Sequence, residues 1–134
     1  MESYYLNEKG IIKTEMLEAL AENEAKKLSN ATIKKKDMTT TQLRKFFNEV
    51  KALEKRLRDN GDSDEYFNKI MPLVKMLKAK IYYSSGRENV TKEFEEFILS
   101  KIDKVRDKND FKAFVLHFEA VVGYFYRFKN LSKR

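Results

Sequence analysis

The segment Met38–Arg58 carries the strongest structural signal in the chain, because its apolar residues recur at helical steps of three and four. At about 100° per residue, these side chains fill one arc of roughly 120° on a helical wheel. The residues of this stripe are Leu43, Phe46, Phe47, Val50, Leu53 and Leu57. The pattern predicts an amphipathic helix with one buried face, and therefore a fold in which other elements cover that face.

The start of this helix has a signal of its own. Thr39 followed three residues later by Gln42 fits a capping box, in which two side chains satisfy free backbone N–H groups reciprocally. Met38 and Leu43 occupy the positions of a hydrophobic staple. We therefore expect the helix to begin at Thr39.

Composition extends the helical prediction to the whole chain. One proline and four glycines in 134 residues leave few helix breakers, which favours an all-α fold over a β-rich one. The length suits a single helical domain, 1–134, with residues 1–13 as an extended or poorly ordered lead-in. We predict a compact bundle of about five helices. They run from Thr14 to Leu28, through Met38–Arg58, from an Asp62 cap to Ser84, from a Thr91 cap to a break at Asp107, and from Phe111 to Leu131.

Two local features should shape the third helix. The stretch from Asp59 to Asp64 reads as a turn in which Gly61 caps the preceding helix. Pro72 lies inside the periodic run, removes a backbone donor and clashes with the carbonyl of Asn68, so we expect a kink or a restart there.

The last predicted helix is apolar on nearly every side. Its apolar residues are Phe111, Phe114, Val115, Leu116, Phe118, Val121, Val122, Tyr124, Phe125, Tyr126 and Phe128. A helix that is hydrophobic all round is either central in its own bundle or covered at an oligomer interface. Both alternatives remain open from the sequence.

Basic charge is concentrated in the middle of the chain. The net charge is +7, and residues 39–87 carry eleven basic and six acidic side chains, net +5. On the 39–58 helix, one flank of the apolar stripe holds a basic ridge with no acidic residue predicted to share it. The ridge consists of Arg44, Lys51, Lys55 and Arg58. A polyanion such as nucleic acid is a plausible partner, and a solvated face is the alternative.

A second basic surface is predicted on the following helix. Lys75 and Lys78 share one side, with Tyr82 between their directions, and this surface could lie beside the first. Arg87 follows at a helix end, where a phosphate could meet a guanidinium and exposed amides. The run Lys34–Lys36 is interpreted as a solvated connector rather than a recognition element.

Catalytic chemistry is not indicated. His117 is the single histidine and lies on an aromatic helix, so we interpret it as a core or boundary residue. No phosphate-binding loop, HExxH or GxSxG motif occurs, and the paired carboxylates have no histidine at metal-binding spacing. We expect no cofactor and no metal. With no cysteine, no signal-peptide pattern and no apolar run of about 20 residues, a cytoplasmic, non-membrane protein is favoured.

Three segments together resemble a known family. TTTQLRKFFNEV, MPLVKMLKAKIYYSSGR and FEAVVGYFYRF, in this order and spacing between Met38 and Phe128, resemble the small helical subunit of type III-A CRISPR (Csm) effector complexes. The resemblance implies a non-catalytic bundle that stacks in several copies against the repeated backbone subunit, in antiviral defence. It also implies contact with the duplex of crRNA and target RNA.

Within the matching segments, the candidate RNA-binding residues are the basic ones. They are Arg44, Lys45, Lys51, Lys55, Arg58, Lys75, Lys78, Lys80 and Arg87. For an isolated subunit without its neighbours, the apolar last helix also implies self-association by dimerisation or exchange of helices. Two other classes remain open: a structural adaptor that does not touch RNA, and a peripheral membrane protein with a basic amphipathic helix. Salt-dependent RNA binding or pelleting with anionic liposomes would distinguish them.

Overall fold

Five α-helices account for most of the computed structural model, which describes residues 2–33 and 35–132. They are α1 (Ala19–Asn30), α2 (Thr40–Asp59), α3 (Asp64–Gly86), α4 (Lys92–Asp103) and α5 (Lys108–Ser132), preceded by a short 3-10 helix, Thr14–Met16. The strands β1 (Thr32–Ile33) and β2 (Lys36–Asp37) form a small antiparallel hairpin between α1 and α2. The prediction of an all-α bundle of about five helices is confirmed.

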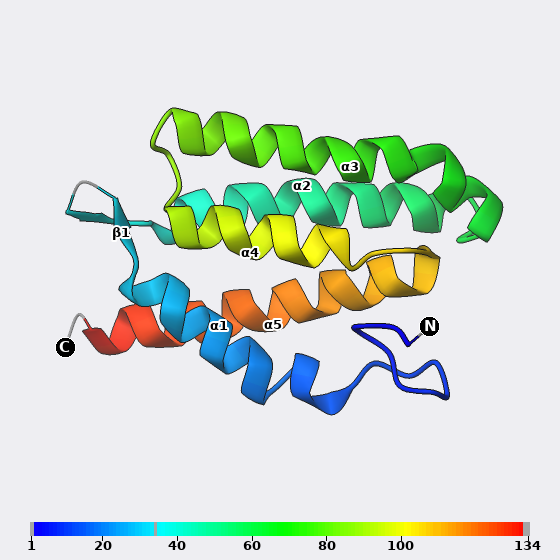
Figure 1. Ribbon diagram of the computed structural model, residues 1–134, viewed down its shortest axis with the longest axis horizontal. Helices are drawn as coiled ribbons and strands as arrows, with labels where there is room; N and C mark the ends of the chain where they lie inside the picture. The colour runs from blue at the N-terminus through cyan, green and yellow to red at the C-terminus, as the bar shows by residue number, and fades with distance from the viewer. Residues whose placement is uncertain (1, 34, 133–134) are drawn as a thin grey trace.

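Helices α2 to α5 run alternately in opposite directions, and α1 lies obliquely across α5 (Figure 1). Helix α5 packs against both α1 and α2, while α4 packs against α3 and α1. Most of the large apolar side chains of α5 are buried. In the described part of this helix, Tyr124, Tyr126 and Phe128 are half-buried against the core, and Leu116 is 44% exposed. Of the two alternatives for the last helix, the structure shows the central position.

An aromatic cluster forms the middle of this core. The ring of Phe118 on α5 lies within 5.2 Å of Phe47 on α2 and 5.5 Å of Phe97 on α4, measured between ring centroids. Phe94 and Phe114 complete the cluster at 6.1 and 5.9 Å from the same ring. Phe118 therefore joins three helices through edge-to-face and tilted contacts, the arrangements that aromatic rings prefer.

The predicted helix starts at Thr39 and Thr91 are confirmed. The Thr39 side chain accepts from the Gln42 backbone, and the Gln42 side chain accepts from the Thr39 N–H, which completes the capping box. The Thr91 hydroxyl accepts from the backbone of Phe94. Each cap satisfies donors that the first helical turn would otherwise leave free.

The Asp62 cap is wrong. Gly61 adopts a φ of 94° and Asp62 a φ of 51°, and the Asp62 N–H donates to the Leu57 carbonyl 3.0 Å away. This left-handed turn closes α2 as predicted for Gly61. It also keeps Asp62 out of the extended conformation that an N-cap needs. Ser63 caps α3 instead, through its hydroxyl and the backbone of Tyr66.

The other helix boundaries differ in detail. The first predicted helix divides into the 3-10 turn at Thr14–Met16 and α1, which begins five residues later than predicted. Helix α5 begins three residues earlier than predicted, because the Asp107 carboxylate accepts from the Asp110 backbone and caps it. Helix α3 continues through Pro72 without a restart, and its first turns lie at an angle to the rest (Figure 1).

The segment before the helices is packed against the bundle. Tyr5 is fully buried, and its hydroxyl donates to the carbonyl of Lys101 on α4. Leu6 and Ile12 pair as an isolated antiparallel bridge. Of the predicted Lys34–Lys36 connector, Lys34 lies outside the described residues, while Lys35 and Lys36 are exposed in the hairpin.

Candidate nucleic-acid interface

The basic ridge lies on the flank of α2 that faces α5. A guanidinium nitrogen of Arg44 donates to the Tyr126 hydroxyl at 3.3 Å. Further along α2, the Lys51 ammonium lies 3.7 Å from a carboxylate oxygen of Glu119. Because Tyr126 and Glu119 both belong to α5, Arg44 and Lys51 of the ridge lie next to α5.

The prediction that no acidic residue shares this flank is wrong. Lys51 pairs with Glu54 at 3.0 Å, and Lys55 pairs with Asp59 at 2.6 Å. Helical positions three and four apart are surface neighbours, and long side chains span the angle that the wheel places between them. The hydrogen bond from Lys55 lowers the pKa of Asp59, so this carboxylate stays ionised beside the ridge.

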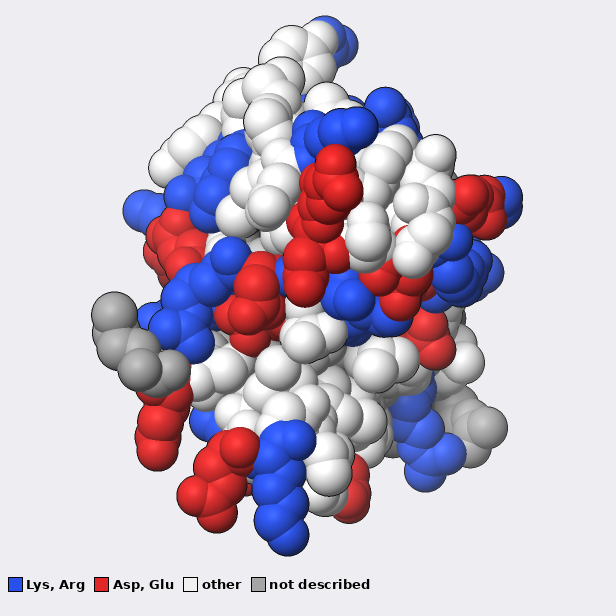
Figure 2. Space-filling view, turned by 90° about the vertical axis from the view of Figure 1, so that its right-hand side faces the viewer, with Lys and Arg blue, Asp and Glu red and all other residues white. Residues whose placement is uncertain are grey.

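The end of the molecule beyond the ridge is also mixed in sign. The carboxylate of Asp62 pairs with Lys112 of α5 at 2.7 Å, and this hydrogen bond lowers the pKa of Asp62. Lys108 donates to the backbone carbonyl of the same residue. Basic and acidic side chains accordingly lie side by side on this end (Figure 2). The ridge is therefore a series of separate cations and not a continuous positive band.

The second predicted basic surface does not lie beside the first. Lys78 pairs with Asp103 of α4, whereas the ridge contacts α5. Lys80, two residues further on, points in another direction and lies 3.6 Å from Glu49 of α2. Lys75, Lys78 and Tyr82 share one side of α3, because this helix is continuous from Asp64 to Gly86. A helical wheel does not show which neighbouring helix lies against each side of α3.

A third group of basic residues lies where α2 meets the last turns of α3. A groove of about 730 Å³ opens there, lined by Phe46, Met76 and Ala79 together with the cations of Lys45 and Lys80. It brings Lys45 and Lys80 together from the predicted set. Arg56, on the same side of α2, donates to the Tyr66 hydroxyl of α3.

Tyr83 is the residue that the sequence interpretation missed. It lines the groove, is 64% exposed, and carries the guanidinium of Arg87 5.5 Å from its ring centroid. The same guanidinium donates to the Tyr83 hydroxyl at 2.8 Å. The sequence spacing could have indicated it, because Tyr83 follows Lys80 by three residues and precedes Arg87 by four. Residues at these spacings are neighbours on one face of a helix.

The nine predicted residues thus fall into two classes within the described part of the chain. Four lysines take part in salt bridges to carboxylates: Lys51, Lys55, Lys78 and Lys80. The other five make no salt bridge there: Arg44, Lys45, Arg58, Lys75 and Arg87. The second class keeps its charge available to an outside anion.

His117 is a core residue, as predicted. Its side chain is fully buried, and Nδ1 lies 2.5 Å from the carbonyl of Met16, to which it donates. Burial lowers the pKa of this imidazole, against the opposing effect of the same hydrogen bond. The histidine links the segment before α1 to α5 and is not open to a substrate.

Within residues 2–33 and 35–132, no helix is long and apolar enough to cross a membrane. No three His, Cys, Asp or Glu side chains in the same ranges come together as metal ligands do.

Comparison with known protein families gave one match. The family described as Csm2 Type III-A matches residues 14–130, which include all five helices except the last two residues of α5. Searches of curated proteins and of solved structures each found no match. Because the family matches most of the chain, this protein belongs to the Csm2 family, the small subunit of the type III-A CRISPR Csm complex.

Proposed function

We propose that this chain is a non-catalytic, cytoplasmic subunit that holds RNA within the type III-A complex through basic side chains of α2 and α3. In this proposal several copies stack along the complex, against the repeated backbone subunit, and contact the phosphates of the crRNA and its target. Family membership supports assembly with other Csm subunits. The RNA contact is inferred from the charges of this chain.

The observation that carries the proposal is the excess of basic residues on two neighbouring helices. Residues 39–87 hold net +5 of the total +7, and this range is α2 and α3 with their flanking turns. Lysine and arginine contacts to phosphates supply affinity without reading sequence. The proposed subunit therefore binds RNA with little sequence preference.

The internal ion pairs rank the candidate residues without excluding any of them. Exposed salt bridges contribute about 0–1 kcal/mol, so a phosphate can compete for Lys51 or Lys55. Arg44 and Arg58 have no carboxylate to give up, because neither makes a salt bridge in the described part of the chain. We expect these two arginines to contribute more to RNA binding than the lysines between them.

The test is a salt titration of RNA binding by matched variants. The double substitution Arg44→Gln with Arg58→Gln removes two charges from the ridge. Lys26→Gln with Lys27→Gln removes two charges from exposed positions on α1 and serves as the control. Each lost phosphate contact lowers the slope of log K against log salt by about 0.7, so the ridge variant should lose about 1.4.

The control variant should keep the slope of the parent. Equal losses from the two variants would mean that net charge alone drives binding and would contradict the ridge. No measurable RNA binding by the parent, alone or in the complex, would contradict the proposed function itself.

A structural adaptor that does not touch RNA is the second candidate. The observation in its favour is that Lys51, Lys55, Lys78 and Lys80 all meet carboxylates of the same chain. An adaptor predicts that the ridge variant assembles with the other subunits normally and that its complex holds target RNA as the parent does.

A further inference from the structure

We propose that the groove between α2 and α3 receives one unpaired base of the bound RNA strand. This inference rests on the proposed function and goes beyond it, because phosphate contacts need only an exposed cation. A base site needs a hollow, an aromatic surface and neighbouring donors. The groove presents all three, and its aromatic residue, Tyr83, is not among the RNA-binding residues predicted from the sequence.

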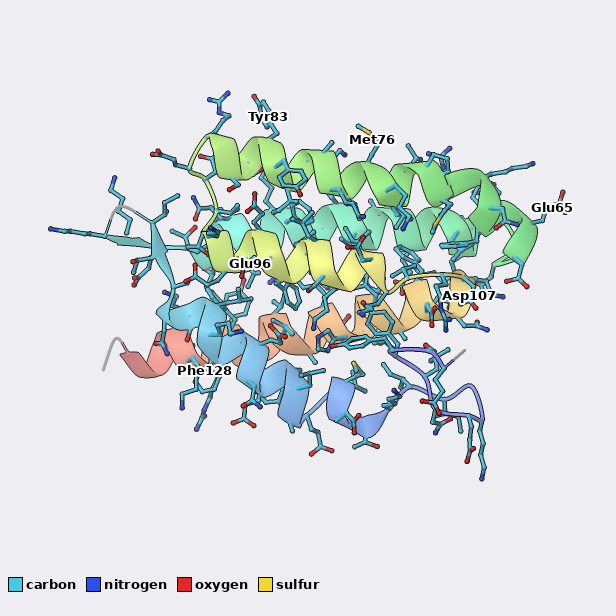
Figure 3. The ribbon with its side chains drawn as sticks, in the orientation of Figure 1. Glu65, Met76, Tyr83, Glu96, Asp107 and Phe128 are labelled. Atoms are coloured by element: carbon cyan, nitrogen blue, oxygen red, sulfur yellow. The ribbon has the colours of Figure 1, made fainter. Side chains whose placement is uncertain are left out.

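The hollow is apolar where it meets the core and has no occupant within the described chain. Phe46, Ala79 and Val90 line it, and Met76 stands at its side with half of its surface exposed. Met76 and Tyr83 project from the same side of α3 (Figure 3). A volume of about 730 Å³ is within the range of small-molecule pockets.

Tyr83 supplies the aromatic surface. Its contact with Arg87, through both the ring and the hydroxyl, restrains the side chain although most of it is exposed. Tyrosine rings on which bases stack, with arginine beside them, are the usual platform for single-stranded nucleic acid. Stacking is tolerant of sequence, so such a site is compatible with a subunit that reads no sequence.

Cations and side-chain amides line the groove beside Tyr83. Lys45 of α2 and Lys80 of α3 both line the groove, so each of the two helices contributes one cation to it. The amides of Gln42 and Asn89 line it too, and the oxygen of Gln42 is already used by the helix cap. The remaining amide donors match the acceptors on a base edge.

Charge favours RNA over a protein segment as the occupant. Glu49 is the acidic residue among those that line the groove, and Lys80 already engages it at 3.6 Å. Asn89 and Val90 also line an adjoining hollow of about 300 Å³ that holds Lys36 and Arg87 beside Asp37 and Glu88. The adjoining hollow has two basic and two acidic side chains and adds no net charge, so the positive charge of the groove itself comes from Lys45 and Lys80 against the single Glu49.

The test uses photocrosslinking with a matched pair of tyrosines. Single-stranded RNA containing 5-iodouridine is irradiated with the full-length chain, and the crosslinked peptides are identified by mass spectrometry. Tyr83→Ala removes the stacking ring and Tyr83→Phe keeps it. Tyr82→Ala removes the neighbouring exposed tyrosine, which does not line the groove.

We expect a crosslink at position 83 in the parent protein. The variants Tyr83→Phe and Tyr82→Ala should keep this crosslink. Tyr83→Ala should lose the crosslink and weaken RNA binding about tenfold, as loss of one base–aromatic stack does. Thermal melting of each variant confirms that the fold is retained, since both tyrosines are exposed.

Three results would overturn the inference. Crosslinks at Tyr82 or outside the groove, with RNA affinity unchanged in Tyr83→Ala, would leave the proposed function standing without the base site. Unchanged RNA binding together with reduced co-purification of other Csm subunits would show that the groove docks a protein. An absence of RNA binding by the parent would remove the proposed function and the base site together.

Discussion

Helices α5 and α3 are the two longest elements, and they use their apolar residues in opposite ways. Helix α5 buries most of its large apolar side chains between α1, α2 and the aromatic cluster. Helix α3 buries a narrow stripe and leaves Leu73, Met76, Tyr82 and Tyr83 between 38% and 64% exposed. Helix α3 also carries four lysines against two acidic residues, net +2.

This difference teaches that apolar content alone does not locate a binding surface. The more apolar helix is the centre of its own fold, where hydrophobic burial stabilises the chain. The less apolar helix displays large side chains that nothing in the described chain covers, next to cations. Exposed apolar residues of this kind indicate a partner more directly than a buried stripe does.

The largest predicted effect is in the aromatic cluster. Phe118→Ala should destabilise the protein by about 3–5 kcal/mol, because Phe118 is fully buried among four other rings. Phe125→Ala, also fully buried on α5, should fall in the same range. Chemical denaturation followed by circular dichroism measures both. Melts that match the parent would show that α5 is not central.

A buried lysine offers the next largest effect. Lys101 on α4 is 5% exposed, and its ammonium meets Glu24 at 3.1 Å and the Tyr4 hydroxyl at 2.9 Å. Lys101→Met keeps the volume but leaves two partners unsatisfied, so we expect a loss of about 1–3 kcal/mol. Lys75→Met, at an exposed position on α3, should cost under about 0.5 kcal/mol. Equal effects would contradict the contrast between core and surface.

His117 should give the core a pH dependence that the surface lacks. Its pKa is lowered in the folded protein by burial, so as pH falls the unfolded chain binds a proton before the folded one does. This contribution destabilises the protein as pH falls below about 6.5, the ordinary histidine value, and levels off below the folded pKa. His117→Gln should flatten the dependence of unfolding free energy between pH 7 and pH 5. An unchanged slope would assign the dependence to other groups.

The smallest predicted effect on stability is at the groove. Tyr83→Ala should change the free energy of unfolding by less than about 0.5 kcal/mol, because the ring is 64% exposed and packs chiefly on Arg87. Denaturation of this variant beside Phe118→Ala compares the two helices directly. A large loss at Tyr83 would mean that α3 needs this ring for its own packing.

Local signals in the sequence predicted local structure well. The capping box at Thr39, the cap at Thr91 and the closing glycine at position 61 each depend on residues within one turn, and each was confirmed. Asp62 failed as a cap because the left-handed turn continues through it, and residue spacing does not reveal a backbone angle.

Contacts between distant residues could not be read from the sequence. The pairs Lys51–Glu119 and Lys78–Asp103 depend on which helices are neighbours, and these pairs divide the basic residues among separate surfaces. Which of Tyr82 and Tyr83 lines the groove also depends on which helices are neighbours, since the two residues are adjacent in the sequence and similarly exposed. The groove is formed by two helices together and has no signature in either one.

The most direct test of the central claim is lysine footprinting of the full-length chain. Acetylation rates of individual lysines are measured by mass spectrometry with and without single-stranded RNA. If RNA meets the α2–α3 side, acetylation of Lys45 and Lys75 should slow when RNA is added, while Lys26 and Lys27 on α1 keep their rates. Slowing at Lys26 and Lys27 with no change at Lys45 and Lys75 would contradict the account.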